Sequence, residues 1–340
     1  MKILITGATS FLGAETARAF LRAGDEVYAP VRPSSKRTGF LPQDPSLHRI
    51  NIDMDEIGRL PETGIPSPEV CVHFAWSGVG VRGRMDPEIQ ERNVRNTLTL
   101  IRTLGEMGCR RFLFAGSQAE YGVTLERVQA AGAAESVPES DAGVGGAVTE
   151  RTACRPISGY GKAKLRILEE GAALARSFGM EYVHMRIFSV YGEGDHETSL
   201  VSSCVGAARE GRRAELGPCR QLWNFLHVRD CAAAVLALVK CGSVATGAAE
   251  RETEAADSSL AGLIYNIGSG DTRPLRDFVQ EVFDIAAACG YDGAGFSLND
   301  RPAGPEGTPY LSPDISKICG VTGWKPEISF REGIREMLLS

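Results

Sequence analysis

Tyr160 and Lys164 are the residues whose types and spacing most clearly suggest chemistry, and they lie in the run PISGYGKAK. A tyrosine four residues before a lysine on a helix places both side chains on one face, one turn apart. The ammonium then favours the phenolate, which lowers the pKa of the phenol and lets it move protons near neutral pH. Such a pair also arises by chance on amphipathic helices, so the interpretation needs support from elsewhere in the chain.

The support comes from the first residues, KILITGATSFLG. An apolar strand at 2–5 is followed by a turn of small residues between Gly7 and Gly13, and then by the helical run ETARAFLRAG. Small residues let the backbone approach a pyrophosphate, and the helix N-terminus offers it free N–H groups and a partial positive charge. With a second strand at 26–31, this predicts a βαβ dinucleotide site. A tight turn without a ligand is the alternative, and Ser10 stands where the middle glycine of such turns is expected.

The order of apolar runs predicts the fold class. Strand-like runs alternate with helical patterns, namely ILITG, EVYAPV, VCVHFA, FLFAGS and YVHMRIFSV. Alternation of this kind is typical of a Rossmann-type α/β fold, a doubly wound parallel sheet that binds the dinucleotide across its carboxyl edge. We expect residues 1–180 to form mainly this dinucleotide-binding domain. Residues 181–340 should form mainly a smaller C-terminal substrate-binding subdomain, with some segments returning to the sheet.

Two segments interrupt the alternation. Residues 123–146 are rich in Ala, Gly, Glu and Ser, and residues 245–258 are acidic and rich in small residues. Both are typical of surface insertions that have no core of their own. The first lies between Ser117 and Tyr160, so it is either a lid over the substrate or a plain solvated loop.

Composition narrows the function classes. The 340 residues are 43% hydrophobic and carry a net charge of −6 with no long basic run, which argues against nucleic acids and acidic membrane surfaces as partners. The nine cysteines show no Cys-x-x-Cys pair, so we expect no metal site and no disulfide framework, and the thiols should be reduced and mostly buried. No run is apolar enough to span a bilayer. A cytoplasmic enzyme is expected.

Several blocks of the sequence, taken in order, resemble the extended short-chain dehydrogenase/reductase family (NAD-dependent epimerase/dehydratase), whose members modify nucleotide sugars. The likeness covers nearly the whole chain. The matching blocks are TGATSFLG, VCVHFAW at 70–76, Asn93 in RNVRNT, FLFAGSQAEYG at 112–122, RIFSVYGEGD at 186–195, FLHVRD at 225–230, YNIGSG at 265–270 and GWKPEISFREGI at 323–334.

The resemblance implies roles for individual residues. Ser117 would hydrogen-bond a sugar carbonyl and Tyr160 would be the acid/base at its oxygen. Lys164 would lower the pKa of Tyr160 and hold the nicotinamide ribose, while hydride moves between the nicotinamide and the carbonyl carbon. The residues expected at the cofactor are Gly7, Thr9, Ser10, Phe11, Leu12, Gly13, Arg32, Ser34, Lys36, Asp53, Met54, Phe74, Ala75, Trp76, Asn93, Tyr160 and Lys164.

Departures from the family pattern restrict the reaction. Family dehydratases carry an Asp-Glu pair directly after the active-site hydroxyl, where this chain has Gln118 and Ala119. Decarboxylases place a carboxylate at the position of Ala119, and members that epimerise at C3 or C5 use a cysteine in this stretch, which has none. The remaining candidates are a 4-ketoreductase and a 4-epimerase, because each needs only the serine, the tyrosine and the lysine.

The end of the second strand favours NADP over NAD. An acidic residue there usually binds the adenosine ribose of NAD, whereas the run VYAPVRPSSKR offers Arg32, Ser34 and Lys36 and no carboxylate. A guanidinium suits a 2′-phosphate, although a merely solvated basic loop is the alternative. A net reductase consumes NADPH and an epimerase retains NAD, so we expect reduction of a nucleotide-linked 4-keto-deoxysugar. An NAD-dependent 4-epimerase is the second possibility, and a cofactor-binding regulatory protein without catalysis is the third.

The substrate half supports this choice only in part. The stretch Gln221, Trp223, Asn224 and Phe225 resembles the Gln-x-Trp-Asp-Phe pattern of reductases such as CDP-abequose synthase. Many family epimerases instead have an arginine at the position of Trp223, which grips the substrate diphosphate. Arg301 is then the better candidate for that task and Arg220 the lesser one.

Other side chains in this half have two interpretations each. Trp223 either stacks on a sugar or base or belongs to the core. His196 is a second acid/base or a solvated loop histidine, and His73 on its apolar strand is a hydrogen-bonded packing residue. The residues expected at the substrate are Gln118, Ser189, His196, Trp223 and Arg301. The family also implies a homodimer formed through a helix pair that includes the Tyr160 helix.

Overall fold

The structure is a computed structural model that describes residues 1–132, 147–242, 260, 262–300, 306–307 and 309–340. The predicted insertion at 245–258, most of the one at 123–146, and Arg301 lie outside the described residues.

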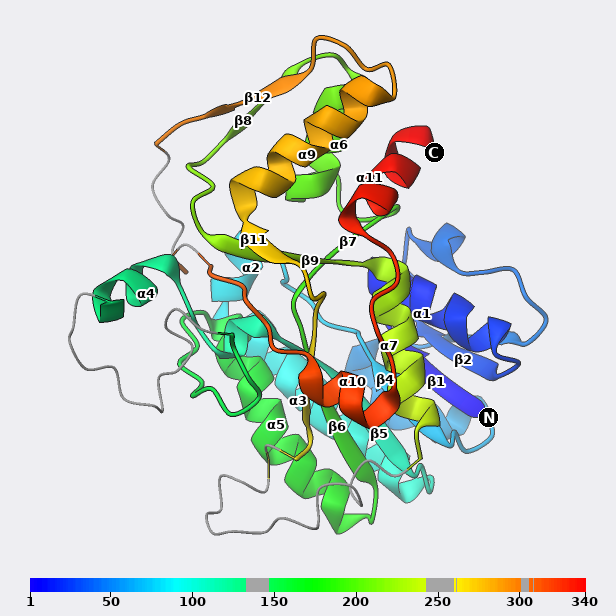
Figure 1. The fold of residues 1–340 in the computed structure, drawn as a ribbon. Coiled ribbons are helices and arrows are strands. Elements are labelled where there is room, and N and C mark those ends of the chain that lie inside the picture. The colour runs from blue at the N-terminus through cyan, green and yellow to red at the C-terminus, as the bar shows by residue number, and fades with distance from the viewer. Residues whose placement is uncertain (133–146, 243–259, 261, 301–305, 308) are drawn as a thin grey trace.

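A parallel sheet of seven strands forms the centre of the molecule (Figure 1). The strands are β1 Lys2–Thr6, β2 Glu26–Val31, β3 Leu47–Asn51, β4 Val70–His73, β5 Arg111–Ser117, β6 Glu181–Ile187 and β10 Ile264–Ile267. Their order is β10-β6-β5-β4-β1-β2-β3, and every pairing is parallel. The chain order reverses between β1 and β4, and in such sheets ligands bind in the crevice at this switch point. The predicted doubly wound α/β fold is confirmed.

Helices cover both faces of this sheet because its strands are apolar on both sides. Ile3 and Ile5 of β1 belong to one core cluster, together with residues of α1 Phe11–Arg22 and α7 Val228–Lys240. Leu4, which points the other way, belongs to a second cluster with residues of α3 Pro87–Glu106 and α5 Gly159–Ser177. The remaining short helical segments are η1 Thr38–Phe40, η2 Met54–Thr63, α2 Val81–Met85, η3 Gln118–Glu120, α4 Leu125–Gly132 and α10 Ser316–Thr322.

The C-terminal half contributes a smaller second set of elements, drawn in Figure 1 beyond the carboxyl ends of the strands. Its strands form two small sheets with the orders β11-β9-β7 and β12-β8. The bounds are β7 Ser189–Tyr191, β8 Arg213–Leu216, β9 Leu222–His227, β11 Thr272–Pro274, β12 Gly295–Leu298, α6 Leu200–Arg209, α9 Leu275–Ala288 and α11 Phe330–Leu339. Phe225, Phe278 and Phe330 pack together in its core. β10 comes from the same half of the chain and returns to the large sheet beside β6.

Element boundaries differ from the sequence-based expectation at two sites. The first helix begins at Phe11, earlier than the run from Glu15 indicated, because Ser10 caps it. The strand expected through Trp76 ends at His73.

Two further sequence-based expectations concern the nine cysteines and membrane-spanning helices. All nine cysteines are free thiols, and five of them are buried. Among the described residues, no helix has the length and apolar character needed to cross a membrane.

Candidate active site

The dinucleotide turn, residues 7–13, lies at the switch point between β1 and β4. Gly7 adopts φ +70°, and a Cβ there would lie 2.8 Å from the backbone nitrogen of Ala75, so this position requires glycine. A Cβ on Gly13 would lie 2.2 Å from the Gly7 carbonyl oxygen. Strand, turn and helix therefore touch backbone to backbone, as the predicted phosphate turn requires.

Ser10 explains how this turn manages without its middle glycine. Its hydroxyl accepts a hydrogen bond from the Gly13 amide at 3.1 Å and so caps α1. Among the described residues, no acceptor is bonded to the amides of Phe11 and Leu12, and the first turn carries no acidic side chain. These two amides and the helix dipole therefore suit the pyrophosphate of a dinucleotide.

Buried hydrogen bonds hold the ends of β1 and β4 together beneath the turn. The Thr6 hydroxyl shares a hydrogen bond with His73 Nδ1 at 2.6 Å and accepts one from the Ala75 amide at 3.3 Å. The other ring nitrogen of His73 meets the Thr97 hydroxyl at 3.0 Å, and burial lowers the pKa of this histidine to about 3. The predicted packing role of His73 is confirmed. Asn93 bonds both backbone groups of Ser77 and thereby shapes the loop after β4.

The basic loop after β2 is exposed at the residues expected to select the cofactor. Arg32, Ser34 and Lys36 are exposed, and no carboxylate occurs between β2 and residue 43. Arg37 is held by the Gly194 carbonyl at 3.2 Å. Of the other residues expected at the cofactor, Asp53 caps η2 through the amide of Asp55, and Met54 packs against the second core cluster.

Ser117, Tyr160 and Lys164, hereafter the Ser-Tyr-Lys set, meet at the carboxyl edge of the sheet. Ser117 ends β5, and Tyr160 and Lys164 lie in the first two turns of α5, which Ser158 caps. The Ser117 hydroxyl faces the Tyr160 phenol closely enough to lower its pKa. Lys164 Nζ donates to the Ala115 carbonyl at 2.7 Å and lies 3.7 Å from the ring centre of Trp76.

The electrostatics of this set bear on the expectation that Lys164 would lower the pKa of Tyr160. Burial raises the pKa of Tyr160, and the groups that oppose this rise are the Ser117 hydroxyl and the charge of Arg84. Burial also lowers the pKa of Lys164 to about 7. Lys164 is not among the main contributions to the pKa of Tyr160, and its ammonium lies against the Ala115 carbonyl and the Trp76 ring, so the expected lowering stays a prediction. Because burial raises its pKa, the phenol is protonated at neutral pH.

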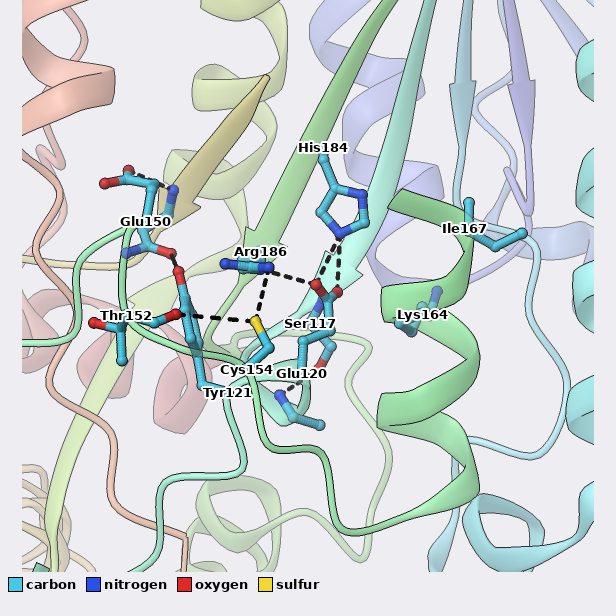
Figure 2. Close-up of polar contacts among 12 residues, drawn as sticks. Ser117, Glu120, Tyr121, Glu150, Thr152, Cys154, Lys164, Ile167, His184 and Arg186 are labelled. Atoms are coloured by element: carbon cyan, nitrogen blue, oxygen red, sulfur yellow. Dashed lines mark hydrogen bonds and ion pairs between the residues drawn. The ribbon is translucent and has the colours of Figure 1, made fainter. Parts of the chain in front are cut away.

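A buried charge network lies directly beside Ser117 (Figure 2). The Glu120 carboxylate is fully buried and accepts from the Ser117 amide at 2.7 Å, from Arg186 Nε at 2.8 Å and from His184 Nε2 at 3.0 Å. Burial opposes ionisation of Glu120, but His184 and Arg186 outweigh it and lower its pKa to about 2. Burial lowers the pKa of His184, and the charge and hydrogen bond of Glu120 act in the opposite direction.

The same arginine ties this network to the neighbouring segments. Arg186 donates to Cys154 Sγ at 3.0 Å, and its guanidinium lies 4.3 Å from the ring centre of Tyr121. Tyr121 in turn donates to the Asn266 side chain of β10 at 2.6 Å. The backbone that presents Ser117 is thus held by side chains from β6, β10 and the segment before α5.

Arg84 in α2 contacts the Tyr160 ring. Its guanidinium carbon lies 4.2 Å from the ring centre. Glu306 holds the guanidinium with two hydrogen bonds, at 2.5 Å to Nε and 2.8 Å to Nη2. The two partners are separated by 222 residues.

The structure describes the surroundings of four residues that the sequence predicts at the substrate. His196 is exposed, and its ring bonds Thr198 within the same loop, at 2.8 Å to the hydroxyl. Trp223 packs against two core clusters, and its buried indole N–H has no partner among the described residues. The core interpretation of Trp223 is therefore the one that its contacts support. Gln118 follows Ser117 in η3, and Ser189 begins β7.

A hollow of about 430 Å³ opens where β11 meets α9. Arg220, Arg276, Asp277 and Asp300 are among the residues that line it. Among the described residues, no cluster of His, Cys, Asp and Glu has the arrangement to hold a metal ion.

Sequence reasoning missed Arg84, Glu306 and the pairing of Glu120 with Arg186. Nothing local distinguishes Arg84 from Arg82 in the run VRGRM. Glu120 follows the end of the apolar strand β5 by three residues, and a carboxylate so close to a buried strand is a signal that it needs partners.

The fold and the site together define a Rossmann-fold protein of the extended short-chain dehydrogenase/reductase type. The family model of the NAD dependent epimerase/dehydratase family matches residues 3–250. The chain therefore belongs to this family, and the expectation that it is an enzyme of this class is confirmed.

Known relatives include both epimerases and a reductase. The UDP-glucose 4-epimerase of Streptomyces lividans is 25% identical over 297 residues, which cover 83% of this chain and 80% of the epimerase. The GDP-6-deoxy-D-mannose reductase of Pseudomonas aeruginosa is 23% identical over 349 residues, covering 99% of this chain and 96% of the reductase.

Solved structures show the same fold over nearly the whole chain. The UDP-glucose 4-epimerase of Thermus thermophilus, in complex with NAD, matches with a TM-score of 0.76 and 20% identity, covering 99% of this chain and 98% of that one. RMD from Pseudomonas aeruginosa, complexed with NADPH, matches with a TM-score of 0.70 and 22% identity, covering 99% and 97%.

Proposed function

We propose that this protein uses NADPH to reduce the 4-keto group of a nucleotide-linked deoxysugar, with Tyr160 as the acid. The observation that carries the proposal is the Ser-Tyr-Lys set at the carboxyl edge of the sheet, with a phenol that is protonated at neutral pH. A reduction needs a proton donor at the carbonyl oxygen, whereas an epimerase must first use the same group as a base.

Each residue of the Ser-Tyr-Lys set would have its own role at the substrate carbonyl. Ser117 holds the carbonyl oxygen, and the Tyr160 phenol donates its proton to that oxygen. One of the three N–H donors of Lys164 binds the Ala115 carbonyl, so the other two are available to hydrogen-bond the nicotinamide ribose. When bound in the dinucleotide turn, the nicotinamide supplies the hydride.

NADPH is favoured by the basic loop after β2. Arg32, Ser34 and Lys36 are exposed and without a nearby carboxylate, a donor set that suits a 2′-phosphate and not a bare ribose. RMD, which resembles this chain in fold, has been solved with NADPH. The epimerase structure solved in complex with NAD supports NAD as the alternative cofactor.

The substrate class follows from the family and from the residues that this chain lacks. The relatives named above act on UDP- and GDP-linked sugars. Gln118 and Ala119 provide no carboxylate for dehydration or decarboxylation. The C-terminal elements would bind the nucleotide. The hollow lined by Arg220 and Arg276 offers two cations for a diphosphate, alongside the carboxylates of Asp277 and Asp300. A homodimer remains part of this proposal, and light scattering tests it.

The deciding experiment incubates the cofactor-free protein with NADPH or NADH and a panel of CDP-, dTDP-, UDP- and GDP-4-keto-6-deoxyhexoses. Stoichiometric oxidation of NADPH with one member, and slower oxidation of NADH, would establish the reaction class and the nucleotide together. No oxidation of either cofactor with any member would contradict the reductase.

An NAD-dependent 4-epimerase is the second candidate, and the relatedness to UDP-glucose 4-epimerases favours it specifically. It predicts that denatured protein releases NAD and that ordinary nucleotide hexoses interconvert without added cofactor. The same assay panel, run with UDP-glucose, distinguishes the two reactions. Absence of both activities while NADPH still binds would favour a cofactor-binding regulatory protein.

A further inference from the structure

Arg84 is the cation that contacts the reactive phenol most directly among the described residues. Its guanidinium lies 4.2 Å from the Tyr160 ring centre, and its side chain is only 19% exposed. Lys164 Nζ, by comparison, lies 5.6 Å from the same ring centre and is already bonded to the Ala115 carbonyl.

Glu306 holds Arg84 in this position. Its carboxylate binds Nε and Nη2 in a two-pronged pair at 2.5 and 2.8 Å, which fixes the plane of the guanidinium as well as its place. Ser158, the residue that caps the Tyr160 helix, also faces Glu306 and helps to lower the pKa of its carboxyl group. The pair therefore joins α2, the start of α5 and a segment near the C-terminus around one phenol.

We propose that Arg84 is a positioning residue for Tyr160 that stabilises the phenolate left after the proton has moved to the substrate oxygen. The proposal rests on the proposed function for its meaning in catalysis. A cation on the ring face favours the charged form of the phenol, because the phenolate and its electron-rich ring both attract it. Arg84 thus performs in this chain part of the task that the family pattern assigns to Lys164.

Several other charged or polar groups face Tyr160, and their effects have known signs. Ser117 from β5 favours the phenolate through its hydroxyl, whereas Glu120 from η3 and Glu306 oppose it by their negative charge. Lys164 from α5 lies closer to the Trp76 ring centre, at 3.7 Å, than to that of Tyr160, at 5.6 Å. Arg84 is the contributor that a single substitution removes without breaking the Ser-Tyr-Lys set.

The first test measures ionisation of Tyr160 directly and needs no substrate. The protein is labelled with 3,5-difluorotyrosine, whose phenol ionises near neutral pH, and followed by fluorine NMR, with Tyr160→Phe assigning the resonance. Arg84→Gln should raise the pKa of this phenol by about one unit, as expected for loss of a cation at this range that a carboxylate partly offsets. Arg84→Lys, which keeps the charge, should titrate between Arg84→Gln and the unsubstituted protein.

Arg82 provides the matched control. It lies in the same short helix, is exposed, and has the same side chain, so Arg82→Gln removes the same charge from the same element. It should leave the pKa of Tyr160 unchanged. The proposal is overturned if Arg84→Gln titrates within about 0.2 unit of the unsubstituted protein, or if Arg82→Gln shifts the phenol as far as Arg84→Gln does.

The second test applies once a substrate is found. Because a weaker acid transfers its proton less readily, Arg84→Gln should lower kcat about 3- to 10-fold with little change in KM. It should also move the alkaline limb of the rate profile to higher pH by about one unit. If the unsubstituted protein turns over no substrate, the proposed function fails, while the NMR titration still decides the role of Arg84.

Discussion

Replacing Glu120 by glutamine removes one buried charge and nearly preserves the shape of the side chain. The carboxylate is 0% exposed and is paired with Arg186 Nε at 2.8 Å. A glutamine oxygen still accepts a hydrogen bond from the Ser117 amide, but the Arg186 guanidinium, itself 2% exposed, loses its counter-charge. The substitution therefore isolates the electrostatic part of the network shown in Figure 2.

Two arguments give similar values for the free energy of unfolding that is lost when Glu120 no longer carries its charge. Breaking a buried ion pair by removing one partner costs about 3–5 kcal/mol. The pKa of Glu120 falls from its usual 4.5 to about 2 in the folded protein. Since one pKa unit corresponds to about 1.4 kcal/mol, this fall represents roughly 3 kcal/mol of stability at neutral pH. We expect Glu120→Gln to lower the free energy of unfolding by about 3–5 kcal/mol.

The pH dependence has a definite sign. Because the folded pKa lies below the unfolded one, the contribution of Glu120 is fully present above about pH 4.5 and is lost as the pH falls toward 2. The difference in stability between the unsubstituted protein and Glu120→Gln should therefore shrink below pH 4.5.

The assay is urea and thermal unfolding at pH 7, followed by circular dichroism. The thermal midpoint should fall by about 5–10 °C in Glu120→Gln. Glu62→Gln is the matched control, because Glu62 pairs with Arg59 at 2.9 Å on the surface, where such pairs contribute about 0–1 kcal/mol. Equal midpoints for the two variants would refute the assignment of a strong buried pair to Glu120.

Three further predictions concern the site. Tyr160→Phe should reduce turnover by about 10²- to 10⁴-fold while cofactor binding and the thermal midpoint stay unchanged, and retained turnover would remove Tyr160 from the mechanism. Arg32→Ala should raise KM for NADPH by about 10- to 100-fold and leave KM for NADH unaffected, whereas equal changes for both cofactors would argue against a 2′-phosphate contact. Gly7→Ala should destabilise the fold by more than Gly24→Ala does and should abolish cofactor binding. Both glycines have positive φ, but only Gly7 has backbone within 3 Å of the added carbon. Unfolding curves and cofactor titrations measure these effects, and similar losses for the two variants would contradict the close approach of the backbone at Gly7.

Much of the fold was predictable because its signals are local. Alternating apolar runs and helical patterns predicted the parallel sheet, and Gly7 and Gly13 marked the turn, since their backbone geometry excludes larger side chains. The spacing of Tyr160 and Lys164 placed both in the first two turns of one helix, where the structure has them. The exposed basic loop with Arg32 could likewise be predicted from the sequence. What defines this loop is the type of its residues, which does not depend on contacts with distant segments.

What the sequence by itself determined was therefore the set of elements, the turn, and which side chains are available at the end of each strand. Only the tertiary structure decided which charges surround the phenol. Arg84 and Glu306 are 222 residues apart, and Glu120, directly after β5, pairs with Arg186 of β6. Both the contacts and the burial that shifts a pKa arise when distant segments pack and exclude water, and no local spacing encodes that.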